Sequence, residues 1–287
     1  MKQRKTLTGS GALLLAAVIW GFGYVVISDS LNLVDVGYLM AYRYILAALG
    51  MAIVFRKHLP SIDHRLLGEG AVLGLLLYFS QYVQTVACGH TTAGKVSFIT
   101  ALYVVLVPIC GLCGFQQKMS RNHWTAVILA LPGLFLLTQA EGGINRGDLL
   151  ALAGSFGFAV HILFSDRFAQ RDSVVLLSLL QFGWAAVYST GVLSISGQPL
   201  LLGEISWAVG SRLIFMGLIS TLMGFFLQMW GQKLVSPSLA AMLLSTEAMF
   251  GLLFSVLLLH EGMTLPMCLG GVLMLAAILV AERTESK

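Results

Sequence analysis

A chain of 287 residues with 57% apolar and only 10% charged side chains carries too few charges to cover a water-soluble surface of its size, since soluble domains hold roughly a quarter of charged residues. Its mean hydropathy of +0.87 indicates a membrane protein. The formal net charge of +4 does not indicate nucleic-acid binding, because the basic residues lie in short clusters between apolar runs and form no single patch.

Ten apolar stretches along the chain are candidates to cross a bilayer, which takes roughly 20 helical residues. The sequence therefore predicts an all-α membrane protein with ten transmembrane helices. The expected helices cover residues 8–28, 36–55, 67–88, 94–114, 123–139, 147–166, 173–196, 210–232, 237–259 and 265–282. Pro108 and Pro132 lie inside two of them, where neighbouring helices must satisfy the backbone groups that proline leaves free.

The distribution of lysine and arginine predicts the orientation of these helices, because cytoplasmic loops carry an excess of both. One set of alternate segments holds most of them: Lys2, Arg4, Lys5, Arg56, Lys57, Arg65, Lys118, Arg121, Arg167, Arg171, Lys233, Arg283 and Lys287. The opposite set holds only Lys95, Arg146 and Arg212. Both termini are therefore expected in the cytoplasm. The basic start leads into apolar residues without a cleavage pattern, so we expect the first helix to remain as an anchor.

The two halves of the chain share residue patterns in the same order. At offsets of 137 to 144 the matches are Tyr24 with His161, Arg43 with Gln181, Tyr82-Val83-Gln84 with Phe226-Leu227-Gln228, and Tyr103 with Glu247. These matches predict two five-helix repeats, residues 1–140 and 146–287. Because five is odd, the second repeat enters the membrane from the opposite side. Inverted repeats are typical of secondary transporters, which bind substrate near the midplane between the halves.

Ionisable side chains inside membrane helices are costly and mark candidate sites. Glu247 lies near the middle of its helix, and is either a cation or proton site or a structural acid hydrogen-bonded to neighbouring helices. Arg43 can attract a substrate carboxylate or lock two helices together. His161 can titrate near neutral pH or be packed and hydrogen-bonded. Lys95, at the start of its helix, can extend its ammonium group to water.

A polar stripe on the third helix is the clearest sign of a cavity. Gln81, Gln84, Thr85 and Cys88 follow the spacing of one helix face. Such a stripe avoids lipid and faces either a cavity or another helix, and we favour the cavity. The expected cavity lining is Trp20, Tyr24, Tyr78, Gln81, Tyr82, Gln84, Ser97, Thr100, Tyr103, His161, Gln228 and Glu247, with Glu247, Arg43 and His161 as candidates for charge coupling.

Three stretches resemble the EamA-type transporters of the drug/metabolite transporter superfamily. They are AAVIWGFGYVV, TTAGKVSFITALYVVLVP and SPSLAAMLLSTEAMFGLLFSVLLLHEGMT. The resemblance covers nearly the whole chain. It implies a ten-helix carrier of the bacterial inner membrane with a cavity lined largely by helices 1, 3, 4, 6, 8 and 9. It also implies export or exchange of amino acids or similar small metabolites, by alternating access and without ATP.

Cationic efflux and intramembrane catalysis are two alternative functions. Multidrug or cationic efflux would make Glu247 essential. An intramembrane enzyme would need a nucleophile–base pair or a metal cluster, and His260-Glu261 has no second histidine at H-E-x-x-H spacing. The residues Gly89 to Lys95 have Walker A spacing, but Val96 stands where a magnesium-binding hydroxyl is required.

The partners follow from these expectations. We expect a small-molecule substrate and the lipid bilayer as partners, and no nucleic acid. We expect no catalytic residue, no cofactor and no metal. The Cys110-x-x-Cys113 pair lies in an apolar run, which favours packing over redox or zinc chemistry. Whether the protein is a monomer or a homodimer is left open.

Overall fold

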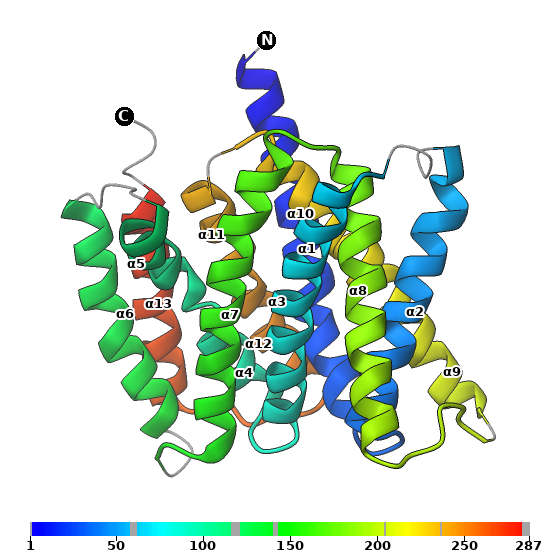
Figure 1. Cartoon of the computed structure of the whole chain (residues 1–287). Helices are drawn as coiled ribbons and strands as arrows, with labels where there is room; N and C mark the ends of the chain where they lie inside the picture. The colour runs from blue at the N-terminus through cyan, green and yellow to red at the C-terminus, as the bar shows by residue number, and fades with distance from the viewer. Residues whose placement is uncertain are drawn as a thin grey trace.

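The computed structural model describes residues 2–57, 62–115, 121–139, 143–203, 205–235 and 237–282. Within these ranges the chain is all-helical (Figure 1). The helices are α1 (Lys2–Ser30), α2 (Val36–Val54), α3 (His64–Cys88), α4 (Ala93–Thr100), α5 (Tyr103–Phe115), α6 (Arg121–Gln139), α7 (Arg146–Ala169), α8 (Val174–Ile195), α9 (Trp207–Ile214), the π-helix η2 (Phe215–Met223), α10 (Gly224–Gln232), α11 (Pro237–Ser245), α12 (Glu247–Leu258) and α13 (Leu265–Glu282).

Eight segments of the described chain are long and apolar enough to cross a membrane, so the protein is a multi-pass membrane protein. The fifth and tenth expected spans correspond to α6 and α13. Their apolar stretches in the described residues, Trp124–Gly133 and Leu265–Ala277, are shorter than a full crossing. The number of ten crossings therefore stays a prediction. Lys118, Arg283 and Lys287, which contribute to the predicted orientation, lie outside the described residues.

Two expected helices are each interrupted in the middle of the span. The segment expected at 94–114 consists of α4 and α5, joined by a turn at Ala101 and Leu102. The segment expected at 237–259 consists of α11 and α12, separated by Thr246. The Thr246 hydroxyl donates to the Leu243 carbonyl at 2.6 Å and so competes with the helical backbone pattern. Both expected helices span the membrane, but neither is continuous.

The third span of the second half contains a π-helical stretch. The helix α9 continues into η2 and then into α10 without a loop, so residues 207–232 form one long rod. A π-helical turn widens the backbone spiral and is frequent at functional sites. The Thr221 hydroxyl donates to the Met216 carbonyl, five residues earlier, at 2.7 Å. The polar side chains of η2 therefore lie close to the centre of the bundle.

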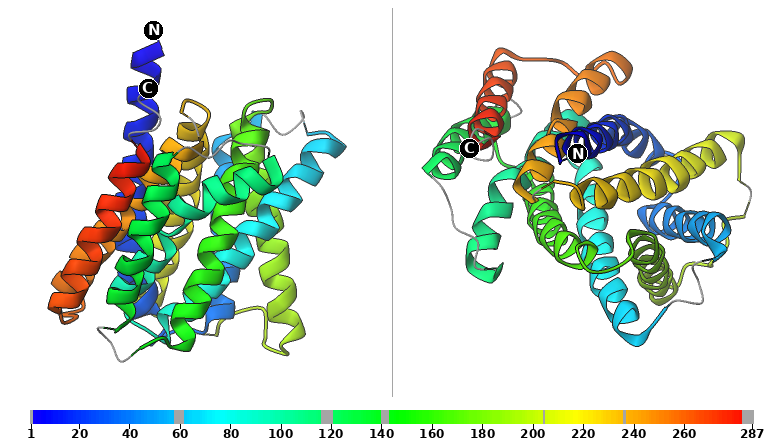
Figure 2. Two further views of the ribbon diagram at one scale, coloured as in Figure 1. Left: turned by 90° about the vertical axis from the view of Figure 1, so that its left-hand side faces the viewer. Right: turned by 90° about the horizontal axis from the view of Figure 1, so that it is seen from above.

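The helices pack in a regular pattern around the centre of the bundle. The helix α3 lies against α7 and α8, while α1 lies against α10 and α12. The helix α2 packs on α8, and α4 packs on α12. Beside this group α6 and α13 pair with each other at one side of the molecule (Figure 2). The central helices enclose the space in which buried polar residues gather.

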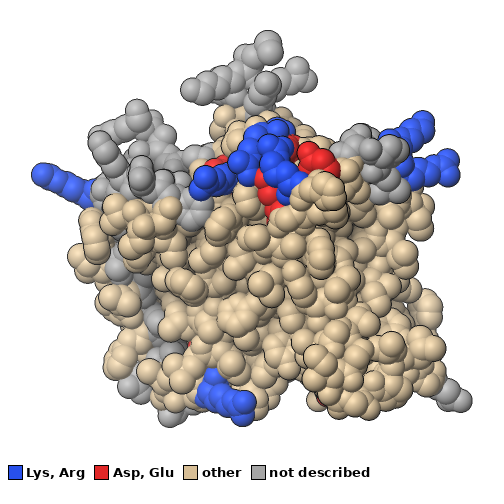
Figure 3. Space-filling view, viewed as in Figure 1, with Lys and Arg blue, Asp and Glu red and all other residues tan. Residues whose placement is uncertain are grey.

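Charge is distributed unevenly over the surface. On the face drawn in Figure 3, basic side chains gather mainly along one edge, and a wide band with few charges separates them from the opposite edge. The start of α1 and the end of α13 lie at the end of the bundle that carries this edge (Figure 1). An apolar band between two polar edges is the pattern expected for a protein embedded in lipid.

Gly74 allows α3 to approach α8 closely. A Cβ atom added at Gly74 would lie 2.8 Å from the Gln181 carbonyl oxygen and 2.7 Å from the Trp184 Cβ atom. We expect Gly74→Ala to lower the free energy of unfolding by about 1–3 kcal/mol, because the backbone of α8 has to move. Denaturant unfolding of the purified protein in detergent measures this change.

The matched control is Gly68→Ala on the same helix, where an added Cβ atom meets nothing within 4 Å. This variant is expected to be neutral or more stable by up to about 1 kcal/mol, since alanine favours helix. Equal unfolding midpoints for the two variants would contradict the close approach of α3 and α8.

Candidate substrate cavity

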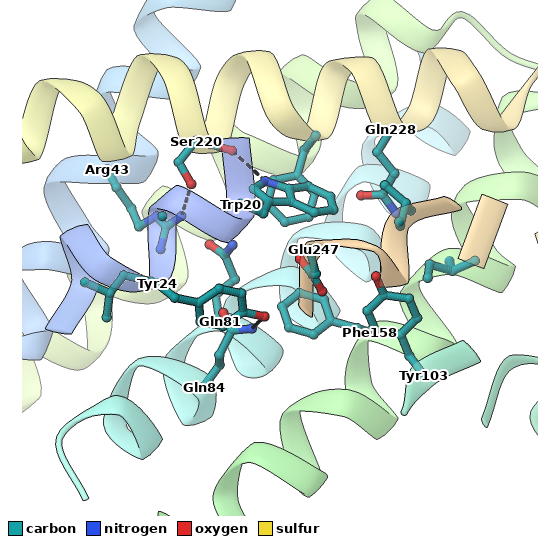
Figure 4. A pocket seen from close by; sticks show the side chains of 15 residues that line it. Trp20, Tyr24, Arg43, Gln81, Gln84, Tyr103, Phe158, Ser220, Gln228 and Glu247 are labelled. Carbon is teal, nitrogen blue, oxygen red and sulfur yellow. Dashed lines mark hydrogen bonds between the residues drawn. The ribbon is translucent and has the colours of Figure 1, made fainter. Parts of the chain in front are cut away.

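A cavity lies at the centre of the bundle, where the two interrupted spans meet η2 and α10 (Figure 4). Nine helices contribute to its wall. The lining residues are Trp20, Gly23, Tyr24 and Ile27 of α1, Arg43 of α2, Gln81 and Gln84 of α3, Tyr103 of α5, Phe158 and Ile162 of α7, Ser220 of η2, Phe225 and Gln228 of α10, Leu244 of α11 and Glu247 of α12.

The cavity is narrow in this conformation. The empty space between the lining atoms is about 460 Å³, a figure that includes its open side. The part of this space that the lining side chains leave free accommodates about two waters. An organic substrate can enter only if the surrounding helices move apart.

Glu247 marks one region of the cavity. It is the first residue of α12, is 3% exposed, and has a carboxyl group that interacts with the hydroxyls of Tyr24 and Tyr103. The Tyr103 hydroxyl faces this carboxyl but reaches no partner at good hydrogen-bond geometry. Gln84 donates to the Tyr24 hydroxyl at 3.0 Å and to the Thr100 hydroxyl at 3.3 Å. No cation among the described residues forms an ion pair with Glu247.

Arg43 marks a second region of the cavity. Its guanidinium is fully buried and donates from Nε to the Thr221 hydroxyl at 2.9 Å and from one terminal nitrogen to the Ser220 hydroxyl at 3.5 Å. The other terminal nitrogen has no partner in the described part of the chain. Trp20 donates its indole N–H to the Ser220 carbonyl at 2.9 Å (Figure 4). Arg43 therefore joins α2 to η2 and also reaches the cavity.

Eight residues predicted from the sequence lie together in this lining, counting both the expected cavity residues and Arg43. They are Trp20, Tyr24, Arg43, Gln81, Gln84, Tyr103, Gln228 and Glu247. The polar stripe of α3 thus faces the cavity with its glutamines. Their common position supports the choice of these residues, and their role in binding stays a prediction.

Four other predicted residues do not line the cavity. Tyr78 lies in a row of aromatic rings with Tyr82, whose ring centroid is 5.7 Å away. Ser97 donates to the Gly94 carbonyl of its own helix at 2.7 Å. Thr100 lies behind the lining, where it holds Gln84. Helical spacing places these residues on polar faces, but the packing of neighbouring helices decides which of them reach the cavity.

His161 does not line the cavity either. Its ring is 1% exposed and lies 3.0 Å from the Gln181 carboxamide oxygen and 3.4 Å from the Ser165 hydroxyl. Both ring nitrogens thus have partners within the second half of the chain. In the structure His161 is therefore packed and hydrogen-bonded, which is the second of the two alternatives that the sequence offers for it.

Seven lining residues were not predicted from the sequence. They are Gly23, Ile27, Phe158, Ile162, Ser220, Phe225 and Leu244. Most are apolar, and an apolar residue in a membrane helix looks the same whether it faces lipid, another helix or a cavity. Ser220 had a usable signal, because a Ser220-Thr221 pair in the middle of an apolar span is a polar feature that lipid does not favour.

The side chain of Lys95 does not extend to water, which the sequence had offered as a possibility. Its side chain is fully buried and forms an ion pair of 3.0 Å with Asp148 of α7, which is itself 4% exposed. Asp148 is held by a capping box with Asn145 at the start of α7. A lysine in a protein interior needs a carboxylate partner. The sequence alone did not indicate that Asp148 would be beside it.

In its described residues the chain is an all-helical bundle with eight segments long and apolar enough to cross a membrane and with a cavity at its centre, which defines a multi-pass membrane protein. The sequence profile of the EamA-like transporter family matches residues 7–139 and again residues 145–282. The chain belongs to the EamA-like transporter family.

Two similar proteins are also named as transporters. The chain is 28% identical over 278 residues to an uncharacterized transporter of Archaeoglobus fulgidus, covering 97% of this chain and 87% of the relative. It is 25% identical to a protein of Pseudomonas aeruginosa named "Probable biotin transporter", covering 93% and 96%. A solved structure titled "Crystal structure of protein" shares the fold with a TM-score of 0.70, 17% identity, and coverage of 97% and 98%.

Proposed function

We propose that this protein is a secondary carrier that exports or exchanges amino acids or similar small metabolites, without ATP, by alternating access through the central cavity. The observation that carries the proposal is the position of the cavity, which lies where α4–α5 and α11–α12 are interrupted. Transporters place their substrate sites at such discontinuous helices near the midplane. The relative named as a biotin transporter supports a small organic solute.

The inverted repeat is part of this proposal. Two separate matches to one family profile, over 7–139 and 145–282, support a duplicated chain. The interruptions fall at corresponding points, because Tyr103 begins α5 and its predicted counterpart Glu247 begins α12. The packing is paired in the same way: α1 on α10 corresponds to α7 on α3, and α6 pairs with its own counterpart α13.

We further place the protein in a bacterial inner membrane with both termini in the cytoplasm. The start of α1 and the end of α13 lie at one end of the bundle (Figure 1), which supports an even number of crossings. The basic edge seen in Figure 3 lies at that same end. By the excess of Lys and Arg in cytoplasmic segments, this end is the inner one.

Ion pairs at both ends of the bundle support a conformation closed to each side. At the proposed inner end, Arg65 and Arg171 pair with Glu69 and Asp172, joining α3 to the loop between α7 and α8. At the proposed outer end, Arg212 of α9 pairs with Asp29 of α1. Opening to either side separates the helices that one of these groups joins.

The outer ion pair gives a direct prediction. We expect Arg212→Gln to increase the outward-open population about 1.4- to fivefold, because a partly exposed ion pair contributes about 0.2–1 kcal/mol. The measurement is the rate at which an impermeant maleimide, added from outside, labels Ile162→Cys in a chain whose four native cysteines are replaced by alanine. Arg56→Gln, an exposed arginine near the proposed inner end, is the control. A rate unchanged or lowered by Arg212→Gln contradicts this function of the pair.

Efflux of cationic compounds is the alternative within transport. A buried acid, Glu247, in the cavity supports it. Arg43 opposes it, because a buried guanidinium in the same cavity repels a cation that has lost its hydration.

Counterflow in liposomes tests the proposed function. The purified chain is reconstituted, loaded with unlabelled solute and supplied with labelled solute, over a panel of amino acids, other carboxylates, nucleosides and quaternary ammonium compounds. Each is measured with and without a pH gradient. We expect accumulation of labelled metabolite above that of empty liposomes. Movement of quaternary ammonium compounds alone favours cationic efflux, and no movement of any solute contradicts a carrier.

A further inference from the structure

Two strongly polar groups that face the cavity lack partners among the described residues. They are one terminal nitrogen of Arg43 and the carboxamide oxygen of Gln228, and the Tyr103 hydroxyl of the lining also has no hydrogen-bond partner there. We propose that the cavity binds an elongated organic carboxylate, with the carboxylate on Arg43, an apolar middle along the aromatic wall, and a hydrogen-bond donor group on Gln228. This inference rests on the proposed carrier function and narrows its substrates, from amino acids and similar metabolites in general to carboxylates whose second polar group lies far from the carboxylate.

Arg43 supplies the anion site. A guanidinium offers five N–H donors, and here two of its nitrogens meet neutral hydroxyls while the third has no partner. No carboxylate of the described chain pairs with it. Leaving a charged group buried and incompletely bonded is costly. A ligand carboxylate can accept from this side chain through charge-assisted hydrogen bonds, for which guanidinium geometry is well suited.

The other region offers hydrogen-bond acceptors. The Gln228 side chain is 2% exposed, and its oxygen has no donor among the described residues. The Glu247 carboxyl and the free Tyr103 hydroxyl line the same region, as Figure 4 shows. An N–H or O–H group of a ligand satisfies an acceptor of this kind. A second carboxylate does not, because it brings no proton and meets the Glu247 carboxyl.

The separation of the two regions determines the shape of the ligand. Ser220, which holds Arg43, and Gln228 belong to one continuous helical rod and are eight residues apart. At the α-helical rise of 1.5 Å per residue this is at most about 12 Å along the axis, because the residues up to Met223 are π-helical and rise less. Figure 4 also shows Arg43 well apart from Gln228. An α-amino acid with an apolar side chain, such as leucine, carries its two polar groups on one carbon and cannot reach both regions.

The wall between the two regions is apolar. Trp20, Phe158, Ile162, Phe225 and Leu244 line it. Trp20 and Phe225 lie against each other with ring centroids 4.6 Å apart. A hydrocarbon chain that packs against these side chains, once the helices have moved apart, gains from leaving water. Other buried atoms without partners, such as the Thr85 hydroxyl, are not among the lining residues, so a missing partner alone does not define this site.

Matched ligands test the inference on the unchanged full-length chain. The probe is 6-ureidohexanoate, which has a carboxylate, five methylenes and a ureido group with N–H donors. It is compared with its neutral amide 6-ureidohexanamide, with hexanoate and with leucine, by titration calorimetry in detergent. We expect the probe to bind at least about tenfold more tightly than each of the others, because each lacks one of the three features. Equal affinity of acid and amide, or tighter binding of leucine, overturns the inference.

Substitutions of Arg43 and Gln228 test which end of the ligand each residue binds. Arg43→Gln is expected to abolish the preference for acid over amide, and Gln228→Leu is expected to abolish the preference for the ureido acid over hexanoate. The controls are Arg167→Gln and Gln170→Leu, at the end of α7 and outside the cavity lining. If Arg43→Gln fails to fold, the comparison of acid with amide on the unchanged chain still decides. Solute movement in counterflow without any carboxylate preference overturns this inference and leaves the carrier function standing, whereas carboxylate binding without movement contradicts the carrier function alone.

Discussion

Replacing Glu247 by glutamine is expected to abolish the acceleration of transport by a pH gradient while exchange at equal pH continues. The carboxyl is buried in the cavity, lies near the hydroxyls of Tyr24 and Tyr103 and forms no ion pair with a described cation. Glutamine keeps its shape and hydrogen bonding but cannot carry a proton through the cycle. We expect gradient-driven uptake to fall by about tenfold or more, the equivalent of about 1.4 kcal/mol, with counterflow changed less than about threefold.

His161→Gln is the control for this prediction. His161 is also titratable and buried in the membrane part of the fold, but it is bonded to Gln181 and does not line the cavity. We expect this variant to keep the dependence on the gradient. Uptake by Glu247→Gln that still follows the pH gradient would exclude proton coupling through this residue. Loss of the dependence in His161→Gln would move the coupling site to α7.

Breaking the ion pair between Lys95 and Asp148 is expected to have the largest effect on stability. Both side chains are almost completely buried and lie 3.0 Å apart. Removing one charge leaves the other unpaired in the interior, which typically costs about 3–5 kcal/mol. We therefore expect Lys95→Met alone, and Asp148→Asn alone, to lower the free energy of unfolding by about this amount. Denaturant unfolding in detergent measures each change.

The double variant Lys95→Met with Asp148→Asn is expected to regain most of this loss, because neither charge then remains. Asparagine also keeps the acceptor that Asp148 provides to the Asn145 backbone N–H at 2.9 Å. A double variant whose destabilisation equals the sum of the single ones would show that the two side chains act independently, against the structure.

Much of the fold could be predicted from hydropathy, because a membrane-spanning helix must bury every backbone polar group within itself. The expected boundaries of the spans fall within a few residues of most observed helices, such as 36–55 against Val36–Val54. The interruptions at Ala101 and Thr246 could not be predicted in this way. They depend on side-chain hydroxyls and on contacts with other helices. Ser245-Thr246-Glu247 is a polar feature of the sequence, but polar residues alone do not indicate where a helix is interrupted.

The candidate site could be predicted in part. Gln81 and Gln84 were identified from their spacing, because polar stripes in membrane helices avoid lipid. The same reasoning also selected Tyr78, whose ring packs against Tyr82 and does not line the cavity. His161, which was selected as an ionisable residue, is hydrogen-bonded to Gln181 of α8. Periodicity reports which face of a helix is polar, and only the tertiary packing decides whether that face meets a cavity or a partner. The same limit explains why the partner of Lys95 was missed.

The chemistry of the cavity is asymmetric between the two proposed repeats. Tyr24 and Arg43 both line the cavity, whereas their predicted counterparts His161 and Gln181 bond to each other at 3.0 Å outside it. Glu247 likewise corresponds to the neutral Tyr103. The first repeat thus supplies the cation and the second the acid. An ancestral scaffold of two equal halves can therefore hold a substrate with two different ends.

The accessibility of Ile162→Cys from the two sides of the membrane tests the central claim, alternating access through this cavity. Ile162 lines the cavity and is 2% exposed in the closed conformation. The cysteine is placed in the chain without native cysteines and treated with an impermeant maleimide in right-side-out and in inside-out vesicles. Alternating access predicts slow labelling in both preparations, protection by transported solute in both, and no steady ion conductance. Labelling from neither side, or from both together with a steady conductance, would contradict the account.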